Sequence, residues 1–367
     1  MKETSILIKP ASSSCNMTCT YCFYDDVSDC RTVKSYGLIS ETTWKTLVDE
    51  SFNSKENFDR VNFSFQGGEP LVAGYRFFKS FVDYTQSTKG TVEVTYSVQT
   101  NGTKINEKFC KLFKEYDFLL GVSIDGFKEN HNLNRFLRDG GSFDDVMAGV
   151  NLLKAYEIPF NILTVLTKNL AKYPEKLFDF YLQNNFDFVQ IIPCLPSFGR
   201  SAEEDLYACT PELYESFYKT FYDIWLKNFE NGKYISENLI DNVITLLMGG
   251  RPSRCGMLGK CETQCIVEAD GGIYPCDFYV LDEFKLGNIN DESFDSVMGS
   301  DNKDKFVNHE NGLPDFCRGC NYINICGGNC KRMRSTFLGE DHCGYQAFLN
   351  EVIPTLNRVN SSINNYQ

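Results

Sequence analysis

The sequence predicts an α/β protein, with a partial (β/α)6 barrel followed by a cysteine-rich domain of short strands and helices. Three observations lead to this prediction. Strand-like runs alternate six times with amphipathic stretches, which is typical of a parallel sheet with crossover helices. A break at 249–252, which contains Gly and Pro, precedes a region dense in Gly and Cys. The 367 residues are long for one domain, so we expect two domains, at 1–235 and 236–367.

The expected strands and helices alternate along the first part of the chain. Strands are expected at 5–9, 61–66, 92–98, 118–124, 160–166 and 188–194. Amphipathic helices are expected near 41–53, 75–87, 106–116, 142–156 and 172–185, with two longer ones at about 211–231 and 236–249. In barrels, active residues gather at the carboxyl ends of the strands. We therefore expect the chemistry of this chain in the loops that follow its strands.

Charge and cysteine content limit the possible partners and compartments. The formal net charge of −13 disfavours nucleic acid or an anionic membrane as a partner. Apolar runs are all much shorter than a membrane span, and the start, MKETSILIKP, lacks the long apolar segment of a signal peptide. Sixteen cysteines in such a chain argue against a disulfide scaffold and for metal ligation in a reducing compartment. We expect a cytoplasmic, metal-binding protein.

Three closely spaced cysteines follow the first expected strand. Cys15, Cys19 and Cys22 form a Cys-x3-Cys-x2-Cys run directly after the apolar residues 6–8. A cubic iron–sulfur cluster takes four ligands, usually thiolates, so three cysteines leave one iron open to a small molecule. The alternatives are a disulfide pair or a zinc site, but zinc needs a fourth ligand nearby and the nearest histidine is His131. The spacing favours a cluster with one open iron.

A second field of cysteines occupies the last third of the chain. Its densest part is a Cys-x2-Cys-x5-Cys-x3-Cys run over 317–330. Taken alone, Cys-x2-Cys pairs suggest zinc as readily as iron, and eight ligands would serve two four-cysteine clusters. The candidates are Cys255, Cys261, Cys265, Cys276, Cys317, Cys320, Cys326, Cys330 and Cys343. Five cysteines are expected to be small buried apolar residues instead: Cys30, Cys110, Cys194, Cys209 and Cys265.

The triad in this context resembles the motif of the radical S-adenosylmethionine (SAM) enzymes, in which SAM chelates the fourth iron. The run 67–70 could be only a tight turn, but it resembles the GGEP element of these enzymes, whose backbone receives the SAM amino group. The resemblance implies SAM contacts at Tyr21, Gly67, Gly68, Glu69, Ser123, Arg135 and Leu195. Arg135 suits a carboxylate by its fork of donors, although Arg138 is close enough to be confused with it.

The second cysteine field resembles the SPASM extension of radical SAM peptide-modifying enzymes, which holds two auxiliary 4Fe-4S clusters. Carried over by position, the ligands of the first auxiliary cluster are Cys255, Cys261, Cys276 and Cys330. Those of the second are Cys317, Cys320, Cys326 and Cys343. Cys265 is a spare near Cys261, so the two assignments could be exchanged. The resemblance thus implies three 4Fe-4S clusters and SAM as cofactors.

Further segments look like the anaerobic sulfatase-maturating enzymes of the clostridial type, namely LIKPASSSCNMTCTYCFY, VKSYG, FSFQGGEP, SVQTNG, HNLNR, CDFYVLD and LGNI. The resemblance implies a radical SAM oxidoreductase that oxidises a Cys or Ser in a Cys/Ser-x-Pro-x-Arg segment to Cα-formylglycine. It also implies a sulfatase polypeptide as partner and an electron donor such as flavodoxin or ferredoxin.

The same resemblance implies roles for three further residues. Asp277, directly after Cys276, matches the family's proposed base, and the negative charge of a thiolate-ligated cluster makes a neighbouring carboxylate a better proton acceptor. The alternative is that Asp277 caps a turn. Tyr24 and Gln66 match residues at the substrate pocket of the family, although Tyr24 could also serve in packing.

Two other functions would share part of this pattern. A SPASM-type maturase of ribosomal peptides, forming thioethers or epimerising residues, would contain both cysteine fields. Asp277 and the sulfatase-type flanking segments favour sulfatase maturation over that alternative. An electron carrier or iron–sulfur scaffold without catalysis would leave the GGEP turn and the SAM-type strand ends without a purpose.

Overall fold

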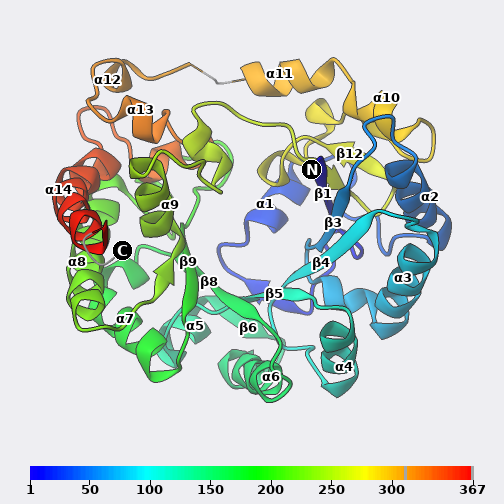
Figure 1. Cartoon of the computed structure of the whole chain (residues 1–367), viewed down its shortest axis with the longest axis horizontal. Helices are drawn as coiled ribbons and strands as arrows, with labels where there is room; N and C mark the ends of the chain where they lie inside the picture. Colours follow the sequence, from blue (N-terminus) through cyan, green and yellow to red (C-terminus); the bar gives the residue numbers. More distant parts are fainter. Residues whose placement is uncertain (310–311, 365–367) are drawn as a thin grey trace. The chain divides into compact units, whose positions relative to one another are not determined.

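The computed structural model contains the alternating strands and helices expected from the sequence (Figure 1). It describes residues 1–309 and 312–364. The chain divides into two units, of which the first unit contains 1–123, 132–160 and 262–309, and the second unit 124–131, 161–261 and 310–367. Among the described residues, no helix is both long and apolar enough to cross a membrane.

The first unit is built on a sheet with the strand order β5-β4-β3-β1-β11-β12-β13. Its strands are β1 (Glu3–Ile8), β3 (Arg60–Phe65), β4 (Glu93–Thr100), β5 (Leu119–Ser123), β11 (Cys265–Val267), β12 (Gly272–Tyr274) and β13 (Gly287–Asn288). The pairs from β5 to β11 are parallel, and the last two are antiparallel. Ile6 and Phe63 are register partners and fully buried. Side chains alternate between the two faces of a strand, so paired residues such as these lie on the same face of the sheet. The loops after β1, β3 and β4 therefore leave the same edge.

A small antiparallel sheet ties the cysteine loop to a later segment of the first unit. Its strands are β2 (Met17–Cys19), β6 (Arg135–Leu137) and β7 (Gly140–Gly141). Cys19 lies opposite Arg135 in its register. This pairing places an expected SAM contact beside an expected cluster ligand.

Helices cover the sheet of the first unit, and α2, α3 and α4 lie outside β3 and β4 (Figure 1). They are α1 (Phe23–Asp29), α2 (Glu41–Phe52), α3 (Tyr75–Thr88), α4 (Glu107–Glu115), α6 (Phe143–Ala155), α10 (Phe294–Met298), α11 (Asn302–Asn308) and the 3-10 turns η1 (Pro70–Ala73), η4 (Asp277–Tyr279) and η5 (Asp282–Phe284). α5 (Lys128–Asn134) connects β5 to β6. The Phe81 ring lies 5.1 Å from the rings of both Phe63 and Phe65, so an aromatic core joins α3 to the sheet.

The second unit contains three parallel strands, β8 (Phe160–Leu166), β9 (Phe188–Pro193) and β10 (Ser236–Glu237). Its helices and 3-10 turns are η2 (Leu170–Lys172), α7 (Pro174–Gln183), α8 (Pro211–Glu230), α9 (Asn238–Leu247), η3 (Cys255–Leu258), α12 (Asp315–Arg318), α13 (Ile323–Cys326), η6 (Arg334–Thr336) and α14 (Gly344–Asn364). Helix α8 packs on α14, where the rings of Tyr218 and Phe348 lie 5.4 Å apart.

The expected α/β class is confirmed, and all six expected strands are present, as β1, β3, β4, β5, β8 and β9. The seven expected helices are α2, α3, α4, α6, α7, α8 and α9, each with ends within two residues of the expectation. Helices α1, α5 and α14 were not expected. The domain boundary near 235 stays a prediction. The two units group residues by spatial contact and not by position in the chain, and β11–β13, which come after residue 235, complete the sheet of the first unit.

Candidate metal centres and active site

Three different local structures place the cysteines of the triad. Cys15 follows two tight turns, in the second of which the Ser14 amide donates to the Ala11 carbonyl at 2.9 Å. Cys19 is the last residue of β2, and Cys22 directly precedes the first turn of α1. The loop therefore folds back on itself between β1 and α1, which brings the three thiols together.

The electrostatics of the triad fit an iron–sulfur cluster. The pKa of the Cys15 thiol is raised to about 12, mainly by desolvation and also by the Glu69 carboxyl and the thiols of Cys19 and Cys22, while the Met17 amide opposes the shift. Ionising these three thiols together is unfavourable without positive charge, which a polynuclear iron centre supplies. Within the described chain, no three His, Cys, Asp or Glu side chains are arranged to hold a single metal ion. A cubic cluster places iron and sulfide between its thiolates, so its ligands stand farther apart than those of zinc.

The glycine turn after β3 lies directly against the cysteine loop. The Gly68 amide donates to the Ser12 carbonyl at 2.8 Å, and the Glu69 amide donates to the Ser14 carbonyl at 2.9 Å. A Cβ atom at Gly68 would lie 2.3 Å from the Ser14 carbonyl oxygen, and Gly67 has a φ of +131°. Glycine is therefore required at both positions. A backbone turn of this kind carries carbonyl groups, which are the acceptors that an amino group needs.

The carboxyl group of Glu69 is fully buried and joins two loops. Its Oε1 accepts from Thr100 Oγ1 at 2.7 Å, and its Oε2 accepts from the Asn101 amide at 2.7 Å. Desolvation raises the pKa of Glu69, while these hydrogen bonds oppose the shift. The Asn101 side chain in turn donates to Asn16 Oδ1 at 3.0 Å. The GGEP turn, the loop after β4 and the cysteine loop are thus held together by hydrogen bonds.

The other expected SAM contacts are distributed between the two units. Arg135 is buried on β6 and donates from Nη1 to the Tyr21 hydroxyl at 3.0 Å. The alternative, Arg138, is exposed, so the structure favours Arg135. Ser123 ends β5 in the first unit, whereas Leu195 follows β9 in the second unit.

Asp277 begins η4 directly after Cys276 and lies beside a buried lysine. Lys9 Nζ is 2.5 Å from Asp277 Oδ1, and Gln66 Nε2 donates to Asp277 Oδ2 at 3.0 Å. The Lys9 side chain is 0% exposed, and that of Asp277 is 16% exposed. The structure therefore brings two expected site residues together and adds Lys9, which the sequence analysis missed. A lysine directly after the apolar run 6–8 was the available signal.

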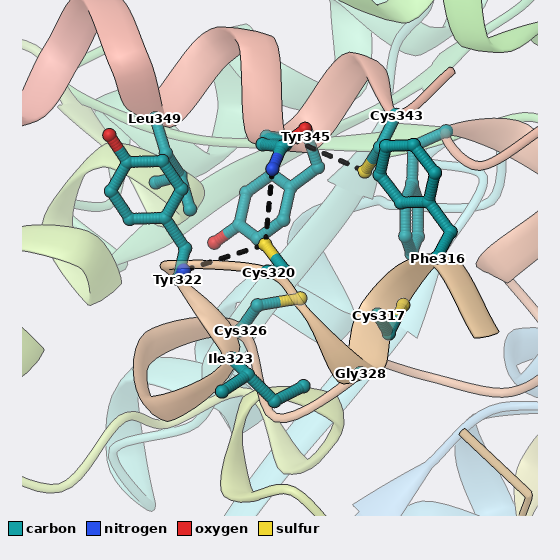
Figure 2. A pocket seen from close by; sticks show the side chains of 12 residues that line it. Phe316, Cys317, Cys320, Tyr322, Ile323, Cys326, Gly328, Cys343, Tyr345 and Leu349 are labelled. Atoms are coloured by element: carbon teal, nitrogen blue, oxygen red, sulfur yellow. Dashed lines mark hydrogen bonds between the residues drawn. The ribbon is translucent and has the colours of Figure 1, made fainter. Parts of the chain in front are cut away.

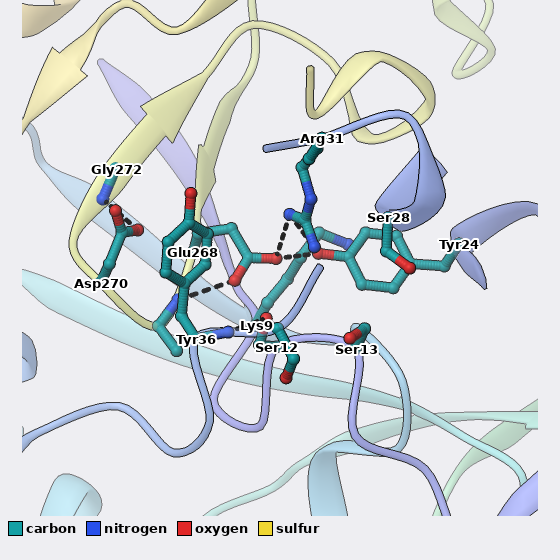
Figure 3. Close-up of polar contacts among 12 residues, drawn as sticks. Lys9, Ser12, Ser13, Tyr24, Ser28, Arg31, Tyr36, Glu268, Asp270 and Gly272 are labelled. Atoms are coloured by element: carbon teal, nitrogen blue, oxygen red, sulfur yellow. Dashed lines mark hydrogen bonds and ion pairs between the residues drawn. The ribbon is translucent and has the colours of Figure 1, made fainter. Parts of the chain in front are cut away.

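Tyr24 belongs to a buried network around Glu268 (Figure 3). Its hydroxyl donates to Glu268 Oε1, to which Arg31 Nη1 also donates at 3.0 Å. Both side chains of the Arg31–Glu268 ion pair are 0% exposed. Lys9 Nζ lies 3.8 Å from the centroid of the Tyr24 ring. Sequence analysis missed Arg31 and Glu268, because 237 positions separate them along the chain.

A cavity of the second unit is lined by the four cysteines expected for the second auxiliary cluster (Figure 2): Cys317, Cys320, Cys326 and Cys343. The pKa of Cys326 is raised to about 12, mainly by desolvation and also by the other three thiols. Gln346 Nε2 and the Tyr322 amide each lie 3.4 Å from Cys320 Sγ. Four convergent thiols with N–H donors to sulfur fit a cysteine-ligated 4Fe-4S cluster.

Three of the four cysteines expected for the first auxiliary cluster are neighbours in the second unit. The pKa of Cys255 is raised by desolvation and then by the thiols of Cys330 and Cys261. The fourth, Cys276, belongs to the first unit. The alternative to Cys261, Cys265, is buried in β11, where desolvation alone raises its pKa to about 12. These surroundings favour Cys261 as the ligand.

The remaining cysteines were expected to be buried, and this is confirmed for Cys110, Cys194, Cys209 and Cys265. For Cys30 the expectation is wrong, since Cys30 is exposed. It follows the last residue of the short helix α1, where the chain turns at the protein surface.

Two family models match the chain. The radical SAM superfamily matches residues 10–181, and the SPASM iron–sulfur cluster-binding domain matches 255–321. The triad and the GGEP turn lie in the first match, and the second match begins at Cys255. The two matches fall on opposite sides of residue 235.

Two relatives and one solved structure extend the similarity over nearly the whole chain. A cysteine-type anaerobic sulfatase-maturating enzyme from Clostridium novyi (strain NT) is 39% identical over 334 residues, which cover 90% of this chain and 89% of the relative. A serine-type enzyme from Bacteroides thetaiotaomicron is 28% identical over 389 residues, covering 100% of this chain and 93% of the relative. The structure of native anSMEcpe with bound AdoMet and Kp18Cys peptide matches with a TM-score of 0.90 at 36% identity, over 98% of this chain and 99% of that chain. The resemblance stated from the sequence motifs is confirmed.

Proposed function

This chain belongs to the anaerobic sulfatase-maturating enzymes of the radical SAM superfamily, and on that premise we propose that it oxidises a cysteine of a sulfatase Cys-x-Pro-x-Arg segment to Cα-formylglycine. Cysteine is preferred to serine as the target residue because the cysteine-type relative is 39% identical and the serine-type relative 28%. One observation carries the proposal above the others. The Asp277 carboxylate is held between Lys9 and Gln66 in the unit that also contains the triad.

The reaction removes one hydrogen atom, one proton and one electron from the cysteine side chain. When bound, SAM and the iron–sulfur clusters supply a 5′-deoxyadenosyl radical, which takes the Cβ hydrogen, and an acceptor for the electron. The thiol proton goes to a base on the protein. Water then hydrolyses the resulting thioaldehyde to the aldehyde and hydrogen sulfide. The chain itself must therefore supply a positioned proton acceptor.

Asp277 is the proposed proton acceptor. Its carboxylate is 16% exposed, so a substrate thiol can reach it. Lys9 and Gln66 occupy one lone pair on each oxygen, and each oxygen retains a second one for the thiol proton. Gln66 thereby links the substrate pocket to the base.

Tyr24 has a supporting role in this proposal. Its side chain is 1% exposed and its hydroxyl donates to Glu268. The Tyr24 ring packs against the Lys9 ammonium group, which lies 3.8 Å from the ring centroid. This arrangement favours the packing alternative raised for Tyr24.

Most of the residues that would hold SAM lie in loops that follow strands of the first unit. The carbonyl groups of Gly67, Gly68 and Glu69 would accept from the amino group, and the Arg135 guanidinium would bind the carboxylate. Buried Glu69 contributes its backbone, because its side chain is engaged with Thr100. The remaining SAM contacts in the proposal are Tyr21, Ser123 and Leu195.

The triad and the two cysteine sets expected from the sequence would hold three 4Fe-4S clusters, with Cys261 as a ligand and Cys265 buried in β11. Residues 1–235 form the radical SAM domain and 236–367 the SPASM domain, as the family matches support. Flavodoxin or ferredoxin is the electron donor. A reducing cytoplasm is the compartment, since eleven thiolate ligands must stay reduced until the clusters are assembled.

The test is anaerobic incubation of reconstituted enzyme with SAM, a reductant and synthetic peptides, followed by mass spectrometry. We expect formylglycine from a Cys-x-Pro-x-Arg peptide, less from the Ser-x-Pro-x-Arg peptide, and none from an Ala-x-Pro-x-Arg control. A thioether or an epimerised residue without aldehyde would instead identify a ribosomal-peptide maturase. Failure to form 5′-deoxyadenosine with any peptide would refute the proposed function.

A further inference from the structure

Lys9 is a buried charged residue that neither gives nor takes a proton in the proposed reaction. It follows β1, where its amide donates to the Val267 carbonyl at 2.8 Å, and its side chain is 0% exposed. A buried ammonium group is unfavourable unless it is paired and hydrogen-bonded. Its ion-pair partner is Asp277, whose Oδ1 lies 2.5 Å from Lys9 Nζ. A pair of this kind fixes both side chains in one geometry.

A second carboxylate of the same network, Glu268, is also influenced by the Lys9 charge, which opposes the rise of its pKa, but Glu268 has its own ion-pair partner in Arg31. Glu268 is 0% exposed and accepts from Tyr24, from Arg31 and, at 3.0 Å, from the Ala269 amide. The Lys9 ammonium group lies over the face of the Tyr24 ring instead (Figure 3), a contact that stabilises a desolvated cation. Arg31 thus compensates Glu268, and Lys9 remains directed to Asp277.

The two oxygens of Asp277 are therefore held from different elements of the first unit. Lys9, at the end of β1, fixes Oδ1, and Gln66, at the end of β3, fixes Oδ2. Two separate anchors determine both the position and the rotation of the carboxylate plane. Rotational control of this kind matters for a base, because the proton must meet a lone pair along its axis.

We infer that Lys9 is a positioning residue for the reaction, which orients the Asp277 carboxylate toward the substrate thiol. The inference rests on the proposed function, in which Asp277 takes the thiol proton. Lys9 acts through Asp277 and does not exchange protons with the substrate. The Tyr24 ring lies against the Lys9 ammonium group, and Glu268 and Arg31 hold the Tyr24 hydroxyl.

The test measures coupling between the two halves of the reaction in reconstituted holoenzyme. Lys9→Met removes the charge and keeps an unbranched side chain of similar length. Iron content and SAM binding should match the wild type, and deuterium from a Cβ-labelled peptide should still reach 5′-deoxyadenosine. Formylglycine per 5′-deoxyadenosine should fall by about 10²-fold, the scale for a misplaced catalytic group. Lys9→Arg, which keeps the cation, should recover part of this ratio.

A matched control and a double variant isolate the effect. Lys34→Met removes an exposed lysine paired with Asp25 and Asp29 in the same unit, and the ratio should not change. In an Asp277→Asn background, Lys9→Met should change the ratio by less than about twofold, because residues acting through one another are not additive. If Lys9→Met fails to load iron, Lys9→Gln replaces it with the same expected loss.

The outcomes separate this inference from the proposed function. A wild-type ratio in an iron-loaded Lys9→Met or Lys9→Gln variant, while Asp277→Asn loses the product, overturns the role of Lys9 alone. Multiplicative effects of Lys9→Met and Asp277→Asn also overturn it. Undiminished formylglycine in Asp277→Asn overturns the base on which both rest.

Discussion

The buried Arg31–Glu268 pair should contribute strongly to the stability of the first unit, and Arg31→Met tests this. The ion pair spans 3.0 Å between two side chains that are each 0% exposed. The substitution also removes the hydrogen bond from Arg31 Nη2 to the Lys34 carbonyl at 2.8 Å. It leaves the buried Glu268 carboxylate without its ion-pair partner, with Lys9 as the remaining nearby cation.

The magnitude follows from the burial of both partners. Breaking a buried pair by removing one partner costs about 3–5 kcal/mol, chiefly because the other charge stays buried and unpaired. Folded domains are stable by only about 5–15 kcal/mol, so the loss should be a large part of the total. Arg31→Met with Glu268→Gln removes both charges and should be less destabilised than Arg31→Met alone.

The dependence on pH identifies Glu268 as the cause. Desolvation raises the pKa of Glu268 above its ordinary value of 4.5, even with Lys9 nearby. A carboxyl group whose pKa is higher in the folded than in the unfolded state does not lower the stability of the protein at a pH below its unfolded pKa. It lowers the stability as the pH rises through the folded pKa. The stability deficit of Arg31→Met should therefore be largest at pH 8 and should shrink toward pH 5.

The assay is urea unfolding of anaerobic holoenzyme, followed by far-ultraviolet circular dichroism at several pH values. The urea midpoint should fall with little change of the m-value. The exposed-pair variant Lys34→Met should unfold close to the wild type, because its side chain is 56% exposed. A midpoint in Arg31→Met within error of the wild type at pH 8, or a deficit that grows on acidification, would refute the reasoning.

Three further predictions concern the clusters, the base and a second buried carboxyl group. Replacing Cys15, Cys19 and Cys22 together by Ala should remove about four of about twelve irons and all SAM cleavage. Iron analysis and chromatography of 5′-deoxyadenosine measure these two losses. Retained SAM cleavage in this variant would contradict the prediction. Asp277→Asn should keep cluster assembly and 5′-deoxyadenosine but lower formylglycine by about 10²-fold or more, measured by mass spectrometry; a near wild-type rate would place the base elsewhere. Burial raises the pKa of Glu237 to about 7, so wild-type stability should fall as pH rises through about 7, by at most ~1.4 kcal/mol per pH unit. Glu237→Gln should lose this slope in urea titrations at pH 6 and pH 8, and an unchanged slope would exclude Glu237 as its source.

Much of the fold could be predicted from local sequence, because each repeat carries its own pattern. The apolar run 6–8 identifies β1, and strand-like runs identify the other parallel strands, since a buried parallel strand is apolar on both faces. Helix α14 was not predicted, because only the cysteine spacing of the last third of the chain was used, and not its hydrophobic periodicity. The short helix α1 spans only Phe23–Asp29, too few residues to show a helical period.

The cysteine triad, the GGEP turn and Asp277 were also visible in the sequence, because each lies in a short motif with a fixed spacing. The residues of each motif are neighbours in the chain, so each motif can be recognised locally. The reason why Gly68 must be glycine is not local, since the carbonyl that excludes a side chain there belongs to Ser14 in the cysteine loop.

The family, the order of the strands along the chain and the ligand candidates could thus be inferred from the residues alone. Which charges compensate one another became visible only in the folded chain. Lys9 and Asp277 are 268 positions apart, and Arg31 and Glu268 are 237 apart; parallel pairing of β11 with β1 brings the later segment beside the earlier one. Residue spacing along the chain does not predict such pairs. The free-energy cost of burying a charge depends on which groups the folded structure places next to it.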